Sequence, residues 1–184
     1  MVVYVCSLEE MPWHVARLRP GHLVSLVAPR EQPPTPAGIA GARHLRLAVD
    51  DISEPLAHYT LPDEDHVRLL IGFLRDWHDA CRRTGPILIH CVAGISRSTA
   101  AALVALALTG PGREALAAEQ LRRAAPHASP NRRIVALADR LLGRAGRLIA
   151  ARESMGPAEP LDAGPLVELP LDRGAVASPT AGEV

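Results

Sequence analysis

The most informative part of this chain is one stretch, ILIHCVAGISRSTAAALVALAL, at residues 87–108. It starts as a short β-branched run, typical of a buried strand, and from residue 99 it is apolar on every side, typical of a buried helix. The loop between them has almost no polar side chains before residue 96. Polar chemistry in this loop must therefore come from Cys91, from residues 96–98 and from the backbone.

A strand, a tight turn and a helix in this order predict an anion-binding loop. Gly94 allows the turn, and the N–H groups at the start of the following helix would surround one point with positive charge. Arg97 adds a planar guanidinium that can grip two oxygens of an anion and stays charged near neutral pH. The same field favours the thiolate of Cys91 over the thiol. We therefore expect a nucleophile and an oxyanion cradle in one place.

The string HCVAGISRS resembles the signature of the cysteine-dependent protein tyrosine and dual-specificity phosphatases, in which His-Cys is followed by five residues, Arg, and Ser or Thr. The matching residues are His90, Cys91, Gly94, Arg97 and Ser98. HLRLAVDDI, residues 44–52, is similar to the acid-bearing strand end of that family, and ASPNRRIVALADRL, residues 128–141, to its late Pro-Asn helix start. The resemblance covers residues 2–148, more loosely in the N-terminal third, and we expect a bacterial member.

The resemblance implies a role for each residue of the loop. Cys91 would attack phosphorus and form a cysteinyl-phosphate, and Ser98 would hydrogen-bond the sulfur and ease its departure. His90 would orient the loop from behind. Arg97 would hold the phosphate oxygens together with the backbone of the other loop residues, Val92, Ala93, Gly94, Ile95 and Ser96. No metal and no other cofactor is implied, because the loop supplies the positive charge.

In this family an aspartic acid on a separate loop protonates the leaving oxygen and then acts as a base. Aligning LAVDDIS with the family's pattern favours Asp51, 40 positions before Cys91, and leaves Asp50 as the second candidate. Asp63 and Asp65 fit better as acids of a first helical turn. Asn131 is either only a helix-start residue or, like its counterpart in the family, a residue that orders the active-site surroundings.

Short β-branched or leucine-rich runs predict strands at residues 2–5, 23–27, 45–49 and 87–89. Helical spacing predicts a long helix between Thr60 and Gly85, and further helices at residues 99–108, 113–125 and 129–148. This order indicates an α/β fold with a central, mostly parallel sheet of about four to five strands flanked by helices, similar to the protein tyrosine phosphatases.

The chain has 184 residues, the size of one domain. We predict a phosphatase-like catalytic domain at residues 1–150 and a Pro/Gly-rich C-terminal tail at residues 151–184. From residue 156 onward, five prolines and four glycines among 29 residues favour flexibility. PLVELPL, residues 165–171, either docks on the domain as an extended segment or belongs to that tail.

Composition restricts the partners and the compartment. Basic and acidic residues number 20 each and aromatic residues make up 3%, so we expect neither a nucleic acid nor an anionic membrane as a partner. The apolar run at residues 100–108 is far shorter than the roughly 20 residues that span a bilayer, and the first residues do not form a secretory signal. Cys6, Cys81 and Cys91 have no paired spacing, which fits a reducing compartment, so we expect a cytoplasmic protein.

Three other functions share parts of this pattern. A pseudophosphatase would bind phosphorylated partners without turnover, a rhodanese-like sulfurtransferase also uses a cysteine in an anion-binding loop, and GISRS is one residue short of an esterase nucleophile elbow. His90 and the Arg97–Ser98 ending favour phosphate. We therefore expect a phosphorylated protein or a small phosphomonoester as the partner. The apolar loop favours a shallow site that takes phosphotyrosine, with phosphoserine and phosphothreonine as further substrates.

Overall fold

The computed structural model describes residues 1–171, without the side chains of residues 81–83, so the Cys81 side chain and the last part of the tail lie outside the described residues. Its centre is a five-stranded sheet in the order β3-β2-β4-β1-β5. The strands are β1 (Val2–Ser7), β2 (His22–Val27), β3 (His44–Ala48), β4 (Ile87–Cys91) and β5 (Val167–Pro170). The first four pair in parallel, and β5 pairs antiparallel with β1. The predicted α/β fold with a mostly parallel sheet is confirmed.

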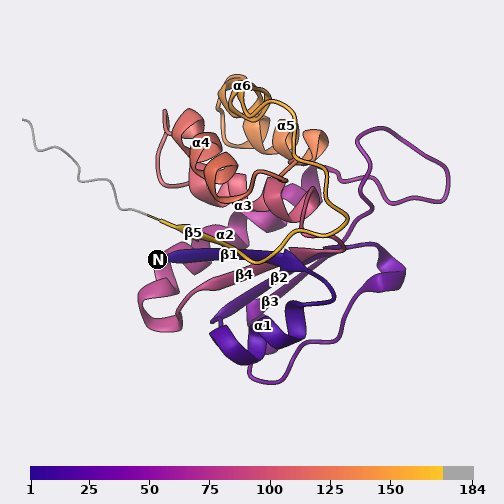
Figure 1. The fold of residues 1–184 in the computed structure, drawn as a ribbon, viewed down its shortest axis with the longest axis vertical. Helices are drawn as coiled ribbons and strands as arrows, with labels where there is room; N and C mark the ends of the chain where they lie inside the picture. The colour runs from indigo at the N-terminus through magenta and orange to yellow at the C-terminus, as the bar shows by residue number, and fades with distance from the viewer. Residues whose placement is uncertain (172–184) are drawn as a thin grey trace, which may run out of the picture.

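Helices lie on both faces of the sheet (Figure 1). One face carries α1 (Met11–Leu18), and the connection from β2 to β3 contains two short 3-10 turns, Pro29–Glu31 and Gly41–Arg43. The helices of the other face and of the cluster stacked on it are α2 (Glu64–Thr84), α3 (Arg97–Ala107), α4 (Glu114–Ala124), α5 (Arg132–Leu141) and α6 (Arg147–Ser154). Among the described residues, no helix is both long and apolar enough to cross a membrane.

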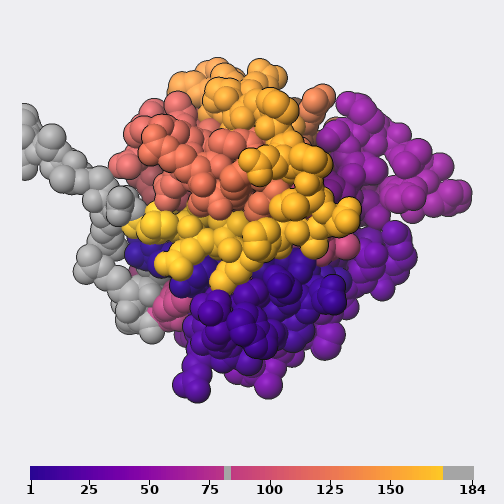
Figure 2. All heavy atoms as spheres, viewed as in Figure 1, coloured from indigo at the N-terminus to yellow at the C-terminus, as the bar shows by residue number. Residues whose placement is uncertain are grey.

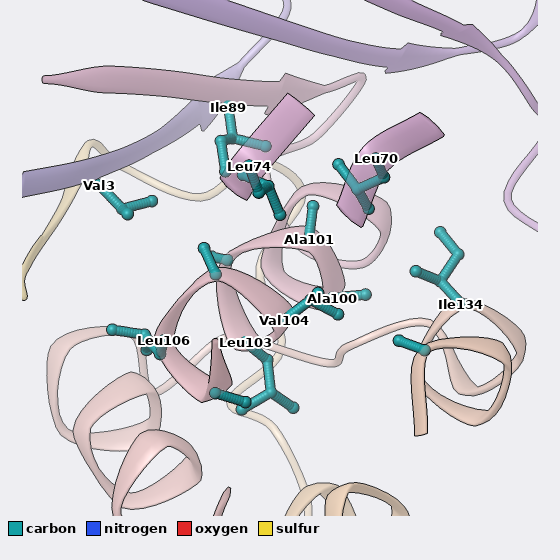
Figure 3. Packing of buried hydrophobic residues seen from close by; sticks show 14 of the residues in the cluster. Val3, Leu70, Leu74, Ile89, Ala100, Ala101, Leu103, Val104, Leu106 and Ile134 are labelled. Atoms are coloured by element: carbon teal, nitrogen blue, oxygen red, sulfur yellow. The ribbon is translucent and has the colours of Figure 1, made fainter. Parts of the chain in front are cut away.

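The core is built around α3, whose residues are all buried. Figure 3 shows its small and branched side chains, among them Ala101 and Val104, packed between the sheet and the neighbouring helices. Leu70 and Leu74 reach it from α2, and Ile134 from α5. Small residues let the helix approach the sheet closely, and close packing leaves it no freedom to shift. The start of α3, where the predicted anion-binding loop ends, is therefore held in a rigid frame.

The prediction of one helix over residues 129–148 is wrong, because two helices, α5 and α6, occupy this region. The Asp139 carboxylate accepts hydrogen bonds from Gly146 N at 2.7 Å and Leu148 N at 2.8 Å. A carboxylate that caps these N–H groups starts a new helix in place of continuing the old one. The short helix α1 was not predicted at all, although Pro12 at its first turn is a typical start signal.

The segment at residues 165–171 docks on the sheet rather than hanging free. Val167 pairs with Val5 and Leu169 with Val3, and Val167, Leu169 and Leu171 are buried. Figure 2 shows this C-terminal segment, in yellow, lying between the orange helical cluster and the indigo N-terminal region. The predicted domain boundary at residue 150 falls inside α6. The chain between α6 and β5 thus crosses the molecule as a strap, which we define as residues 156–166.

Candidate active site

The candidate site lies at the carboxyl end of the central strand β4, where ligands commonly bind in parallel sheets. The loop between β4 and α3, residues 92–96, forms the floor of a cavity of about 480 Å³ together with Cys91 and Arg97. The cavity walls come from the connections that follow β2 and β3 and include Arg30, Asp51 and Tyr59. Segments distant in sequence therefore meet over the cysteine.

Four carbonyl groups of this loop accept hydrogen bonds from backbone N–H groups outside it. The pairs are Leu8 N to Val92 O (3.0 Å), Gly164 N to Ala93 O (2.8 Å), Ser129 N to Ile95 O (3.0 Å) and Asn131 N to Ser96 O (3.2 Å). In a trans peptide the carbonyl and the following N–H point in opposite directions. The N–H groups of Ala93, Gly94, Ser96 and Arg97 therefore face the inside of the loop, and no acceptor in the described part of the chain takes them up.

Glycine is the only residue type that fits at position 94. Its φ is +74°, and an added Cβ would lie 2.9 Å from the Cys6 carbonyl carbon and 3.0 Å from Ser7 N. Residues that carry a Cβ rarely adopt this φ. The backbone atoms of Cys6 and Ser7 also cannot move aside to make room for one. The missing side chain thus lets the loop pack directly on the end of β1.

Cys91 is 1% exposed, and its Sγ lies 3.1 Å from Ser98 Oγ, so a hydroxyl on the first turn of α3 can stabilise the sulfur. Cys6 is different, although it lies in the neighbouring strand. It pairs in register with His90, belongs to the smaller apolar cluster on the α1 face, and burial raises its pKa above the usual range. The two thiols therefore sit in different environments, and only Cys91 lines the cavity.

Arg97 is 5% exposed and is held from one side, because its Nη1 donates to Val49 O at 2.8 Å. Its Nε has no hydrogen-bond acceptor among the described residues and lies 3.9 Å from Asp51 Oδ2. A buried guanidinium donor without an acceptor is costly unless a ligand supplies one. Together with the four inward N–H groups, Arg97 gives the cavity floor several hydrogen-bond donors of the kind that an anion with several oxygens can accept.

Asp51 is anchored through one carboxylate oxygen. Its Oδ1 accepts from Ser96 Oγ at 2.7 Å and from Asn131 Nδ2 at 2.8 Å, while Oδ2 makes no hydrogen bond within the described residues. Asn131 also caps α5, because its Oδ1 accepts from Arg133 N and Ile134 N at 3.1 Å each. Asn131 is thus both a helix-start residue and a residue that orders the site. Asp51 lines the cavity, and its second oxygen, Oδ2, makes no hydrogen bond among the described residues but lies 3.9 Å from Arg97 Nε.

Asp50 also lines the cavity, but its carboxylate makes different contacts. Its carboxylate is buried, its Oδ2 accepts from Thr60 N at 2.8 Å, and its own N donates to Thr60 O at 2.8 Å. These two bonds close the neck of the loop at residues 51–59, which projects from the body in purple in Figure 1. Arg30 Nη1 lies 3.6 Å from Asp50 Oδ1 and ties this neck to the cavity wall. Arg30 and Tyr59 could not be predicted from the sequence, because neither lies in a recognisable motif.

His90 lies behind the loop, on the α1 face of the sheet. It is fully buried, its Nε2 lies 2.6 Å from Ser25 Oγ, and burial lowers the pKa of its ring to about 4. A neutral buried ring supports the strand end from which Cys91 leaves, and it does not reach the cavity lining. In the described part of the chain, no group of three His, Cys, Asp or Glu side chains could hold a metal ion.

No family model matches the sequence, and the search of curated proteins found no relative. Solved structures do match. DUSP15 is 22% identical, with a TM-score of 0.60 over 83% of this chain and 89% of that one. The Yvh1 phosphatase domain from Chaetomium thermophilum is 18% identical, with a TM-score of 0.58 over 79% and 93%. PTPMT1 in complex with PI(5)P is 15% identical, with a TM-score of 0.56 over 78% and 94%. The chain therefore has the fold of the tyrosine and dual-specificity phosphatases.

Proposed function

We propose that this chain is a cysteine-dependent phosphatase that hydrolyses phosphomonoesters, with phosphotyrosine in proteins as the substrate that fits best. The observation that carries the proposal is the cavity floor. There Cys91 and Arg97 line one cavity, and four N–H groups of the loop have no acceptor in the part of the chain that the structure describes. This is the arrangement that a transferring phosphoryl group needs, because its charge spreads over three equatorial oxygens while a nucleophile attacks in line.

In the first step the Cys91 thiolate attacks phosphorus. The S–P bond forms, the bond from phosphorus to the ester oxygen breaks, and the leaving oxygen takes a proton from Asp51 Oδ2. The anchored position of Asp51 supports this assignment, because Ser96 and Asn131 engage only Oδ1. Asp50 is less suited, because its carboxylate is buried and its Oδ2 is held by the backbone N–H of Thr60, while the Asp51 carboxylate is partly exposed.

In the second step water attacks the phosphorus of the cysteinyl-phosphate and gives its proton to Asp51. The S–P bond breaks, inorganic phosphate forms, and the electron pair returns to sulfur as the thiolate. Ser98 Oγ, 3.1 Å from the sulfur, can donate a hydrogen bond to that thiolate and lower the cost of its departure. No electron donor or acceptor is needed in either step.

The cavity walls support an aryl ester. Tyr59 is 47% exposed and lines the same cavity as Cys91, together with the apolar side chains of Ile52 and Val92. Flat apolar surface beside the phosphate site favours an aromatic ring over the short polar stem of phosphoserine. The structural neighbour PTPMT1 was solved with PI(5)P. A phosphoinositide is therefore the natural competitor in a substrate panel.

The proposal is tested with purified protein under reducing conditions and a panel of p-nitrophenyl phosphate, a phosphotyrosine peptide, the matching phosphoserine peptide and a short-chain PI(5)P. We expect turnover of the two aryl phosphates, a covalent adduct of the mass of phosphate on the Cys91 peptide after acid quench, and no turnover by Cys91→Ser. Cys6→Ala is the matched control, because Cys6 is equally buried but lies outside the cavity, and it should keep full activity.

Other results would point elsewhere. Binding of phosphopeptide without turnover by the folded wild-type protein would favour the pseudophosphatase. Thiosulfate sulfurtransferase activity at Cys91 without phosphatase activity would favour the rhodanese-like enzyme. Ester hydrolysis lost in Ser96→Ala but kept in Cys91→Ser would favour the esterase. Preference for PI(5)P over both aryl phosphates would overturn the substrate assignment and leave the chemistry in place.

A further inference from the structure

A chain of buried polar side chains runs beneath the candidate site, on the α1 face of the sheet. Ser25 of β2 and His90 of β4 are paired in register, and alternate residues of neighbouring strands share a face. Ser25 Oγ lies 2.6 Å from His90 Nε2 and 2.8 Å from His44 Nε2 of β3. His44 Nδ1 in turn lies 2.9 Å from Thr35 Oγ1. The side chains of Thr35, His44, Ser25 and His90 thus form a continuous hydrogen-bonded chain. It runs from the segment after β2 to the residue that precedes Cys91.

This chain can run in only two directions. Burial lowers the pKa values of His44 and His90 to about 4, so near neutral pH each ring is uncharged and carries one N–H. Ser25 has a single hydroxyl proton and can donate it to only one of its two neighbouring rings. The other ring must then donate its Nε2–H to Ser25 Oγ. The choice made at Ser25 therefore fixes which nitrogen of each ring carries the proton.

The surroundings of His90 select one direction. Among the described residues, no partner lies within hydrogen-bond geometry of His90 Nδ1, while the backbone of Cys91 raises the pKa of the His90 ring against the larger effect of burial. Because Ser25 Oγ occupies Nε2, Nδ1 is the nitrogen left to face this backbone group, which attracts an N–H and repels a lone pair. Arg97 and His44 are the charged or titratable groups whose fields oppose protonation of His90, and Cys6 faces it in register from β1. The favoured direction is Thr35 O–H to His44, His44 Nε2–H to Ser25, and Ser25 O–H to His90 Nε2.

We propose that Thr35, His44 and Ser25 are positioning residues for the nucleophile, which hold His90 in the tautomer with its proton on Nδ1 and thereby fix the backbone of Cys91 where β4 becomes the loop. The proposal deepens the proposed function, because it assigns the support of the nucleophile. None of the three residues lines the cavity. Their effect therefore passes through His90, and they are not catalytic residues.

The test uses Ser25→Ala, His44→Gln and Thr35→Val in the full chain. With each, three quantities are measured: the 15N shifts of the histidine rings, the pH midpoint of Cys91 alkylation by iodoacetate, and kcat and KM on p-nitrophenyl phosphate. We expect the wild type to show His90 with Nδ1 protonated. In Ser25→Ala we expect a mixture of His90 tautomers and a higher pH midpoint of Cys91 alkylation. We also expect kcat to fall roughly tenfold with little change in KM, because losing an outer hydrogen-bond partner commonly costs activity of this order. The same three effects should be smaller in His44→Gln and smallest in Thr35→Val.

His22→Gln is the matched control, because His22 is a buried histidine of the same strand whose ring packs on Phe73 on the other face. It should change stability without moving the alkylation midpoint. The proposal is overturned if wild-type His90 carries its proton on Nε2, or if folded Ser25→Ala keeps the wild-type midpoint and kcat. Should Ser25→Ala not fold, His44→Gln and Thr35→Val decide in the same way. Tautomer and alkylation need no turnover, so a protein without phosphatase activity that still shows both responses would refute only the proposed function.

Discussion

Asp51 and Asn131 are 80 positions apart in the sequence, yet Asn131 Nδ2 donates to Asp51 Oδ1 at 2.8 Å. The same asparagine starts α5 by accepting two backbone hydrogen bonds. The helical cluster therefore reaches into the site through one side chain and sets the position of a carboxylate on the opposite wall. Ser96 Oγ, at the end of the loop, also donates to Asp51 Oδ1. Asp51 is therefore fixed relative to both the loop at residues 92–96 and the helical cluster.

Replacing Asp51 separates its role from that of Asp50. In Asp51→Asn, kcat/KM for phenyl phosphate, whose leaving group is poor, should fall about 10²-fold or more, since a general acid contributes on that order. For p-nitrophenyl phosphate the loss should be much smaller, because p-nitrophenolate departs without a proton. Asp50→Asn keeps an acceptor for Thr60 N and should lower both rates by the same modest factor. Equal losses on both substrates in Asp51→Asn would remove Asp51 as the acid.

Substitutions of Asn131 separate capping from positioning. Asn131→Ser retains an oxygen that can cap α5 but has no amide to donate to Asp51, whereas Asn131→Ala loses both. We expect Asn131→Ala to lower the free energy of unfolding by about 1 kcal/mol and Asn131→Ser by clearly less, measured by urea denaturation. Both should lose activity on phenyl phosphate to a similar degree. Activity that follows stability across the two variants would mean that only the cap matters.

Local pattern was sufficient to predict the four parallel strands and the loop. A β-branched run, a glycine at the turn and an arginine three residues later constrain the chain within a dozen residues, so β4, the loop and α3 were placed correctly. Asp51 was also predicted, from its resemblance to an acid-bearing strand end, but Arg30 and Tyr59 were not. Both reach the cavity from connections whose path depends on the whole sheet, as Figure 1 shows for those connections. Nothing local marks Tyr59 as a cavity residue, because its neighbours carry no periodic pattern.

The polar chain beneath the loop could not be predicted for a related reason. Ser25 and His44 are ordinary strand residues until the order β3-β2-β4 places them beside His90. The contact between Gly164 and Ala93 depends likewise on β5 joining the sheet antiparallel to β1, and the composition of that region favoured a flexible tail. Interactions between segments that the sheet order brings together carry no sequence signal until that order is known.

The pH dependence of stability should report the buried histidines. Because burial lowers the pKa values of His44 and His90 from 6.5 to about 4, the unfolded chain binds more protons than the folded chain between these values. Stability therefore falls as the pH drops from 6.5 toward 4, with a slope of up to about 1.4 kcal/mol per pH unit for each ring. Urea denaturation at pH 4.5, 5.5 and 6.5 measures it. In His44→Gln the slope should decrease, and an unchanged slope would contradict the assignment of His44.

The strap is expected to hold the anion cradle in shape. Gly164 N donates to Ala93 O at 2.8 Å, and a Cβ at Gly164 would collide with the ring of His127, which is itself buried. Gly164→Ala should push the strap away from the loop and raise the inhibition constant of vanadate, with a loss of kcat/KM of about 10-fold to 100-fold, since misplacement on the scale of an ångström carries such costs. Gly72→Ala, with open space around its Cβ, is the control and should keep both values. Wild-type vanadate inhibition in folded Gly164→Ala would show that the strap only completes the sheet.

Tyr59 should determine the preference for aryl substrates. Tyr59 lines the cavity, whereas Leu56, on the same projecting loop and similarly exposed, does not. An aromatic contact contributes about 0.5–1.5 kcal/mol beyond burial, so Tyr59→Ala should lower kcat/KM for a phosphotyrosine peptide roughly 2-fold to 12-fold and leave the matching phosphoserine peptide nearly unchanged. Tyr59→Phe keeps the ring and should behave like the wild type, and Leu56→Ala tests whether any apolar loss on the loop has the same effect. If Leu56→Ala and Tyr59→Ala lower both peptides alike, the loop acts by general contact with the substrate chain and Tyr59 does not select the aryl group.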